Sequence, residues 1–335
     1  MTLEQDLENL RKKLTGDKKK DIEILFSSLQ RFDDRPYKDE IINKISDMLQ
    51  DLLKDTDKKT SNLLTAYIQR QASADYDKKL LAIKKNVDEG KYQEAVDASI
   101  PLEKDILSAI ENGKATQGDD SLSFRFYFSA MEYDLGNRFF PGNNVMLPID
   151  AVSLYTLRGQ AFFFLKEDEK AIESIRYAFN FDPVSVDLCF LLADIEKERM
   201  NGLSYLSYIE RAKDYLYREG DYLRYLKYMA EYYRIFEKDD KTADELMTLL
   251  KKGKTYKGIT TITKSTWQKE HKKILKDLSE KKIELLISDN VLSTAFDCYK
   301  ECVNADDREG INYYKSLLLP LIDKKEIDAL SKKTK

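Results

Sequence analysis

Glycine and proline are scarce in this chain. Its 335 residues include 12 glycines and 6 prolines, about half of what average usage would supply. Because these two residues end helices and form tight turns, their shortage disfavours a fold of many short strands and favours long helices. The charged fraction of 35% and the hydrophobic fraction of 42% are those of a folded chain, neither disordered nor embedded in a membrane.

Histidine is almost absent as well. His271 is the only one, which excludes metal sites and active sites built from several histidines. The sequence has no glycine-rich phosphate-binding loop, HExxH helix, GxSxG elbow or paired CxxC motif. With no nucleophile near it in sequence, His271 is expected to be an exposed surface residue. These absences predict a protein that is not an enzyme and holds no cofactor or metal.

The three cysteines do not make up a metal site or a disulfide framework. Cys298 and Cys302 are four residues apart and would share a helix face, but they supply only two of the four ligands that a tetrahedral metal needs. Two small buried hydrophobic side chains are the favoured interpretation. Three cysteines cannot all pair within one chain, which is typical of a reducing compartment.

Long hydrophobic runs are missing too. The longest, Leu317 to Ile322, is interrupted by Pro320 and is far shorter than the roughly 18 residues that a membrane-spanning helix requires. The first residues, MTLEQDLENL, lack the basic and apolar regions of a secretory signal. We therefore expect a cytoplasmic protein without a transmembrane segment, and nothing in the sequence predicts its oligomeric state.

Apolar residues recur at helical spacing along most of the chain. One helix is predicted after Pro36, with Ile41, Ile45 and Leu49 on one face, and another is predicted around Leu25. Sustained alternation with a period of two is not found. Breakers divide the chain into about twelve to thirteen helices joined as antiparallel hairpins, an all-α fold. The breakers include Gly90, Gly113 to Asp119, Gly136 to Pro148, Pro183, Gly202, Gly220, Asp239-Asp240, Asp306 and Pro320.

One glycine lies inside a helical pattern rather than at a boundary. A glycine at position 159 costs about 1 kcal/mol relative to alanine in a helix, so its presence indicates close packing against a neighbour. The residues around it follow a spacing of small and aromatic side chains: Tyr155, Gly159, Phe162, Ala171, Ile175, Ala178 and Pro183. This stretch resembles a tetratricopeptide repeat (TPR), a pair of helices repeated about every 34 residues. Arg158 departs from the pattern, because the family has leucine at that position.

A second, degenerate copy follows in the same register. Its residues are Cys189, Leu192, Ala193, Tyr205, Ile209 and Ala212, with Tyr217 where the family has proline. We place the best copy at 152–185 and the second at 186–219, and a weaker third copy extends from Tyr222 to Leu249. The predicted organisation is an N-terminal helical hairpin region at 1–60, TPR-like repeats at 61–250 and a C-terminal helical region at 251–335.

The resemblance implies a right-handed α-solenoid whose first helices line a concave surface. It also implies a non-catalytic interaction module or scaffold that binds a protein or peptide partner there. Carried over position by position, the partner-binding residues are Thr156, Gln160, Phe163, Asp187, Phe190, Asp194 and Lys197. Family members that grip a C-terminal carboxylate use lysine and asparagine at such positions. Two aspartates and two phenylalanines stand here instead, which favours a peptide with apolar and basic side chains.

Tyrosine is concentrated near the second copy. Nine of the 21 tyrosines fall between Tyr205 and Tyr233. Packing between the helices of a hairpin is the favoured interpretation, and an aromatic groove for a peptide is the alternative.

Lysine is concentrated between Lys251 and Lys282, where eleven lysines meet three acidic residues. A solvated surface is the favoured interpretation. The alternative is a regulatory protein whose solenoid binds a partner while this segment contacts nucleic acid or another polyanion. Nucleic acid is the less favoured partner, because the segment contains no arginine. The candidate anion-binding residues are Lys264, Trp267, Lys272, Lys273 and Lys276.

Overall fold

The computed structural model describes residues 2–16, 21, 24–25, 28, 37–53, 74–147, 149–255, 269, 271–283, 285 and 287–319. These residues form 14 α-helices and two strands of three residues each. The chain is therefore mostly helical, as predicted. No helix in the described ranges is both long and apolar enough to cross a membrane.

The chain divides into two compact units, Met1–Phe126 with Gly142–Leu165, and Tyr127–Pro141 with Lys166–Lys335. We call them unit 1 and unit 2 and describe each by itself. Unit 1 contains α1 (Leu3–Arg11), α3 (Lys38–Leu53), α5 (Ala74–Asp88), α6 (Tyr92–Gln117), β1 (Ser123–Arg125), β2 (Asn144–Met146) and α8 (Ala151–Phe164). The two strands pair in parallel, with Ser123 opposite Asn144.

Two hydrophobic regions hold unit 1 together. Leu7 and Leu10 of α1 pack with Ile41, Ile45 and Leu49 of α3, which confirms the apolar face predicted after Pro36. Helices α5, α6 and α8 pack against one another. Charged and aromatic pairs fasten α6 to α8: Arg158 lies 2.6 Å from Glu103, and the rings of Tyr92 and Phe164 stack with centroids 4.7 Å apart. The interior Gly159 is buried on α8.

Two predicted breaker segments, Gly113 to Asp119 and Gly136 to Pro148, begin inside helices and contain the ends of those helices. Helix α6 continues through Gly113 to Gln117, and Gly118 ends it in the left-handed conformation with a φ of 63°. A Cβ at Gly113 would lie 2.8 Å from the Phe124 ring, and one at Gly136, inside α7 (Ala130–Phe139), would overlap the ring of Tyr127. An aromatic ring lies beside each glycine, so each helix continues past the glycine at which its predicted breaker segment begins and ends within that segment.

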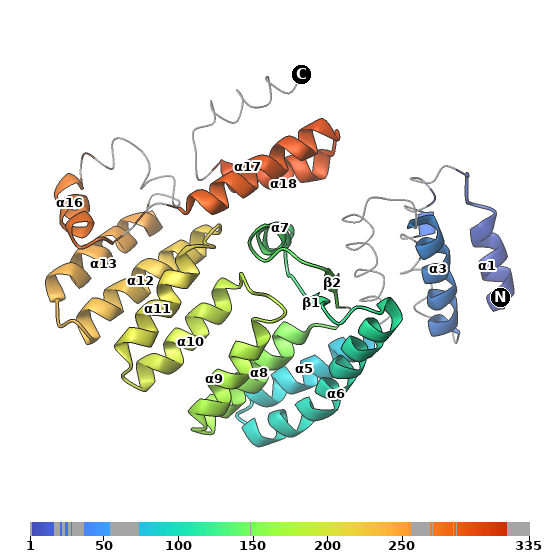
Figure 1. Cartoon of the computed structure of the whole chain (residues 1–335), viewed down its shortest axis with the longest axis horizontal. Helices are drawn as coiled ribbons and strands as arrows, with labels where there is room; N and C mark the ends of the chain where they lie inside the picture. The colour runs from blue at the N-terminus through green and yellow to red at the C-terminus, as the bar shows by residue number, and fades with distance from the viewer. Residues whose placement is uncertain are drawn as a thin grey trace. The chain divides into compact units, whose positions relative to one another are not determined.

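Unit 2 contains the remaining helices. They are α7 (Ala130–Phe139), α9 (Asp168–Ala178), α10 (Val186–Glu198), α11 (Gly202–Lys213), α12 (Glu219–Ile235), α13 (Asp240–Thr255), α16 (Lys272–Glu280), α17 (Asp289–Asn304) and α18 (Arg308–Leu318). Helices α9 to α13 each pack on the next in chain order (Figure 1). Helix α17 packs against α18 and against α7.

Short polar caps set where these helices begin. The side chain of Ser185 accepts from the Leu188 amide before α10, and that of Asn201 accepts from Ser204 before α11. Asp239 accepts from the Thr242 amide at 3.1 Å, as expected for a helix N-cap. Asp119, at the end of the breaker segment that starts at Gly113, accepts from the Ser121 amide in the turn before β1. Because each cap satisfies amides that the helix itself leaves unpaired, the connections between α10 and α13 stay short.

The tyrosine-rich region is mainly packing. Its buried members are Tyr205, Tyr217, Tyr222, Tyr225, Tyr228 and Tyr232. Tyr205 is fully buried, and its ring stacks on those of Tyr228 and Tyr232 with centroids 6.1 and 6.3 Å away. Its hydroxyl donates to the Tyr228 carbonyl at 3.0 Å. The packing interpretation is thus confirmed for these six residues.

Candidate interaction face

Helices α10 and α12 are joined by side chains that are 34 positions apart in the sequence. The Tyr228 hydroxyl donates to the Asp194 carboxylate at 2.6 Å across 34 positions. The Lys197 ammonium donates to the Glu231 carboxylate at 2.9 Å across the same separation. Beside these pairs, the rings of Phe190 and Tyr228 lie with centroids 4.7 Å apart. We call this strip of α10 and α12 the α10–α12 face.

Helical spacing explains why these side chains meet. On α10, Asp187, Phe190, Asp194 and Lys197 are three or four residues apart, so they project from one side of the helix. On α12, Arg224, Tyr228 and Glu231 do the same. Two helices that lie side by side with such stripes facing each other bring equivalent positions into contact, one pair per turn.

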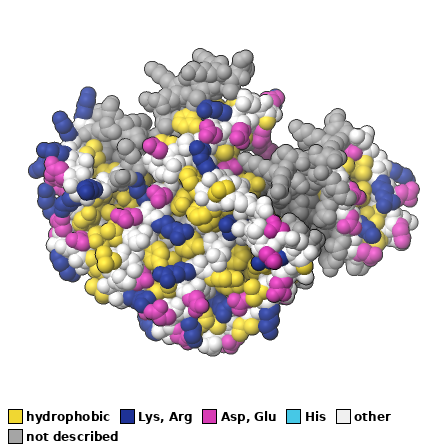
Figure 2. Space-filling view, viewed as in Figure 1, with side chains coloured by type: hydrophobic (Ala, Val, Ile, Leu, Met, Phe, Trp, Pro, Cys, Tyr) yellow, Lys and Arg dark blue, Asp and Glu magenta, His cyan; other side chains and the backbone are white. Residues whose placement is uncertain are grey.

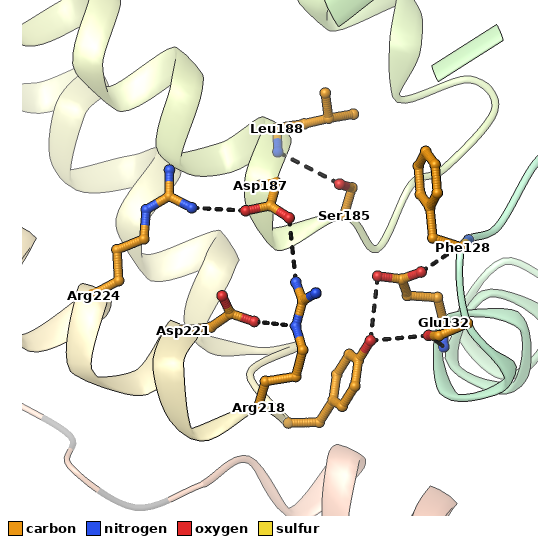
Figure 3. A network of polar contacts seen from close by, with 10 residues as sticks. Phe128, Glu132, Ser185, Asp187, Leu188, Arg218, Asp221 and Arg224 are labelled. Atoms are coloured by element: carbon orange, nitrogen blue, oxygen red, sulfur yellow. Dashed lines mark hydrogen bonds and ion pairs between the residues drawn. The ribbon is translucent and has the colours of Figure 1, made fainter. Parts of the chain in front are cut away.

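Two arginines hold the end of the face where both helices begin (Figure 3). Arg224 donates to Asp187 at 2.7 Å and Arg218 donates to the same carboxylate at 3.2 Å. Arg218 also donates to Asp221 through Nε. The Arg224 guanidinium lies 4.5 Å from the centre of the Phe190 ring, a cation–π contact that fixes its orientation.

The pKa values along the face follow from burial and pairing. Burial raises the pKa of Tyr228, and its hydrogen bond to Asp194 raises it further. Burial also raises the pKa of Asp221, against the attraction of Arg218. Burial opposes the charged form of Lys197, but the hydrogen bond and the charge of Glu231 outweigh it and raise the pKa of that ammonium.

The charges on the face are paired with one another. Acidic and basic side chains alternate, and each carboxylate has a cationic neighbour: Asp187 with Arg218 and Arg224, Asp221 with Arg218, Asp194 with Lys197, and Glu231 with Lys197 and Lys227. The preference for basic peptide side chains assumed that the two aspartates of α10 were unpaired. Because both are already neutralised, the face offers no excess negative charge. Figure 2 shows the same intermingling of acidic and basic side chains over the described part of the surface drawn there.

The residues predicted to bind a partner fall into two sets. Asp187 is exposed, Asp194 and Lys197 are partly buried, and Phe190 is fully buried beneath Arg224. The other three (Thr156, Gln160 and Phe163) are partly buried on α8 in unit 1. The structure therefore brings together the four residues of α10, and Phe190 supports this face from below.

Sequence reasoning missed the α12 half of the face. Its residues are Arg218, Arg224, Tyr228 and Glu231. A signal for three of them was present, because adding 34 to Phe190, Asp194 and Lys197 gives Arg224, Tyr228 and Glu231. The third repeat was recognised too weakly to be used in that way.

The lysine-rich segment is described only in part. Lys264 and Trp267 lie outside the described residues. Lys272, Lys273 and Lys276 are exposed on α16, where Lys276 lies 3.6 Å from Glu280. His271, which was expected to be exposed, is 7% exposed; that prediction was wrong, because the residue begins an amphipathic helix whose Leu278 is also buried. Lys281 pairs with Asp239 and Thr242 and so ties the end of α16 to the start of α13.

The three cysteines are thiols and not disulfides. Cys189 and Cys298 are buried and Cys302 is partly buried. Burial raises the pKa of the Cys189 thiol to about 12, so this side chain stays protonated and behaves as a small hydrophobic group. Among the described residues no group of three or more metal-ligating side chains comes together.

Comparison with known proteins adds no relative. No protein-family model matches this chain, and no curated protein matches it.

Proposed function

We propose that this chain is a non-catalytic interaction protein, in which a TPR-like solenoid binds a partner peptide on the α10–α12 face. In this proposal α10 with α11 and α12 with α13 are successive repeats, and α10 and α12 are their inner helices. The observation that carries the proposal is the pair of hydrogen bonds between residues 34 positions apart, Asp194 with Tyr228 and Lys197 with Glu231.

Stacked repeats provide a direct reason for such contacts. When one helical hairpin repeats and stacks on the next, equivalent positions of neighbouring repeats come side by side, and a separation equal to the repeat length results. Small buried residues at the hairpin contacts (Ala171, Ala178, Ala193 and Ala212) are compatible with closely approaching helices. The two helices of the first copy, α8 and α9, belong to different units, so the argument depends on the second and third copies.

The chemistry of the face favours a peptide of mixed charge. The side chains of Lys197 and Glu231 are 27% and 25% exposed, so they are held in place and still reach solvent. A partner that binds them loses little free energy to side-chain ordering, because the pairing of Lys197 with Glu231 has already fixed the rotamers of both side chains. An extended peptide with acidic and basic side chains in alternation would complement the charges along α10 and α12.

A charge swap separates binding from folding. Short random peptides displayed on phage would be selected against the wild-type chain, and the enriched peptides would then be tested on Lys197→Glu and on Lys197→Glu/Glu231→Lys. The single variant breaks the pair, whereas the double variant restores it with reversed polarity. We expect the double variant to melt above the single variant but below the wild type, because Lys197→Glu puts a carboxylate beside Asp194 and Glu231→Lys puts an ammonium beside Lys227. It should bind the enriched peptides at least tenfold more weakly than the wild type.

The matched control swaps an ion pair away from the face. Lys241 of α13 lies 2.7 Å from Asp277 of α16, and Lys241→Asp/Asp277→Lys should leave peptide affinity unchanged. If no peptide is enriched on the wild type, or if enriched peptides bind the Lys197/Glu231 double swap equally well, the α10–α12 face is not the binding site.

A further inference from the structure

A single helix of unit 2 comes from a loop of unit 1. Residues Tyr127–Pro141, which contain α7, belong to unit 2, whereas the chain up to Phe126 and from Gly142 belongs to unit 1. The neck of this loop is closed by β1 and β2, where the Leu147 amide donates to the Arg125 carbonyl at 2.7 Å and the Ser123 amide to the Asn143 carbonyl at 3.0 Å. The segment that contains α7 therefore leaves unit 1 after β1 and rejoins it before β2, and these two strands are paired.

Three other elements of unit 2 contact α7. Tyr217, in the turn before α12, contacts Ser129 at 2.9 Å and donates to Glu132 at 3.3 Å. On α17, Asp297 accepts from Arg138 at 3.0 Å. On α18, Tyr314 donates to Asp134. All residues from Met131 to Gly136 are buried, so α7 is covered on every side of the helix, as a bound helical ligand would be.

The buried surface of α7 combines apolar and acidic side chains. Met131 and Leu135 are fully buried and four residues apart, which places them one above the other on the helix. Between them stand two buried carboxylates, Glu132 and Asp134. Tyrosine hydroxyls from two different elements donate to these carboxylates. The site around α7, which we call its seat, therefore encloses a five-residue pattern, with an apolar residue at each end and acidic residues at the second and fourth positions.

The hold on α7 is weakened by one of its carboxylates, Glu132. Glu132 accepts from the Tyr217 hydroxyl and from the Phe128 amide, and among the described residues no cation forms an ion pair with it. Burial raises the pKa of this carboxyl, which the charge of Arg218 and the hydrogen bonds only partly offset. Removing a carboxylate from water without a paired cation is costly. The apolar contacts of a ten-residue helix must overcome that cost, so α7 can open without unfolding the rest of unit 2.

We infer that α7 is an internal occupant of a helix-binding seat, and that the seat accepts a partner's acidic amphipathic helix when α7 leaves. The partner's helix carries the pattern of Met131 to Leu135: two apolar residues four apart with carboxylates between them. The seat is formed by the turn before α12 and by α17 and α18, and it adjoins the α10–α12 face at Arg218, whose guanidinium lies 5.4 Å from the centre of the Tyr217 ring. The inference stands or fails independently of the proposed function.

The test uses the loop itself as the probe. A fluorescent peptide of residues 127–141 would be titrated into the full wild-type chain and into full chains carrying Gly136→Ala. A methyl group at Gly136 would overlap the Tyr127 ring and so weaken the internal α7 without altering the seat. We expect the variant chain to bind the wild-type peptide about tenfold or more tightly than the wild-type chain does. The same peptide with Leu135→Glu should bind neither chain.

A second measurement needs no variant. Hydrogen exchange of the wild-type chain should show the amides of α7 exchanging at least tenfold faster than those of α10 and α12, through an opening smaller than global unfolding. Exchange of α7 only together with α10 and α12 would overturn the inference. So would a Gly136→Ala chain that melts cooperatively and does not bind the peptide. If that variant does not fold, the exchange measurement alone decides.

Discussion

The contact between Asp194 and Tyr228 allows a quantitative test of repeat stacking. The hydroxyl of Tyr228 donates to the Asp194 carboxylate at 2.6 Å across the boundary between the proposed second and third repeats. Tyr228→Phe removes the hydroxyl and keeps the ring against Phe190, whereas Asp194→Ala removes the acceptor. A double-mutant cycle isolates the energy of this one contact from the other effects of each substitution.

The magnitude follows from the geometry. A hydrogen bond to a charged group contributes about 1.5–3 kcal/mol. Tyr228 is 5% exposed, but the Asp194 side chain is 38% exposed, so water competes for the carboxylate and lowers its value. We therefore expect a coupling free energy of about 1 kcal/mol, stabilising the folded chain.

Urea unfolding followed by circular dichroism at equal m-values would give the four free energies of unfolding. The control cycle combines Asp194→Ala with Tyr233→Phe, because Tyr233 packs edge-on against Tyr232 on the same helix instead of bonding to α10. The coupling free energy of this control cycle should be close to zero. A coupling below about 0.3 kcal/mol for Asp194 and Tyr228 would refute the reasoning.

Three further predictions concern other parts of the chain. Gly202→Ala should lower the free energy of unfolding by about 1–3 kcal/mol in a urea melt, because the new Cβ would lie 2.9 Å from the Phe236 ring. The control Gly220→Ala places its Cβ in open space and should be neutral or stabilising. Equal effects of the two substitutions would contradict the packing of Gly202 against Phe236. Burial raises the pKa of Glu132, so the folded chain keeps this proton to higher pH than the unfolded chain and the residue disfavours folding increasingly as pH rises above its ordinary value of 4.5. Glu132→Gln should therefore gain stability relative to the wild type as melts are taken from pH 4.5 to neutral pH, and a constant difference would contradict the assignment. The regulatory alternative predicts that the chain is retained on heparin in a salt-dependent way, and that retention falls when alanine replaces the three exposed lysines of α16, Lys272, Lys273 and Lys276. Unchanged retention would count against this alternative.

The sequence was informative where a helix has one apolar face. The stripe of Ile41, Ile45 and Leu49 predicted α3, because a three-and-four spacing of apolar residues has no comparable explanation in a strand. The acidic residue Asp239 likewise predicted the start of α13. Both are local features, set by residues within a few turns of one another.

Long-range packing was harder to predict. The breaker segments that begin at Gly113 and Gly136 contain the helix ends, but each glycine itself lies inside a helix, under an aromatic ring whose position depends on the tertiary fold. The placement of α7 in unit 2 has no local signal at all. His271 was expected at the surface, because its neighbours in sequence are charged, and the burial it shares with Leu278 comes from the packing of α16.

The candidate face falls between these cases. Its α10 half was found from the repeat register, because Asp187, Asp194 and Lys197 occupy matching helical positions. Its α12 half was missed, because the predicted third copy lacks the small residues on which the prediction of the first copy was based. The charge balance of the face also could not be read from α10 alone, since Arg218 and Arg224 come from the other helix.

The most direct test of peptide binding at the α10–α12 face is to map which backbone amides a selected peptide protects from hydrogen exchange. Hydrogen exchange would be recorded with and without a peptide enriched on the wild-type protein. The account predicts slower exchange in α10 and α12, with α11 and α13 unchanged. Protection of α11 and α13 without protection of α10 and α12 would contradict it.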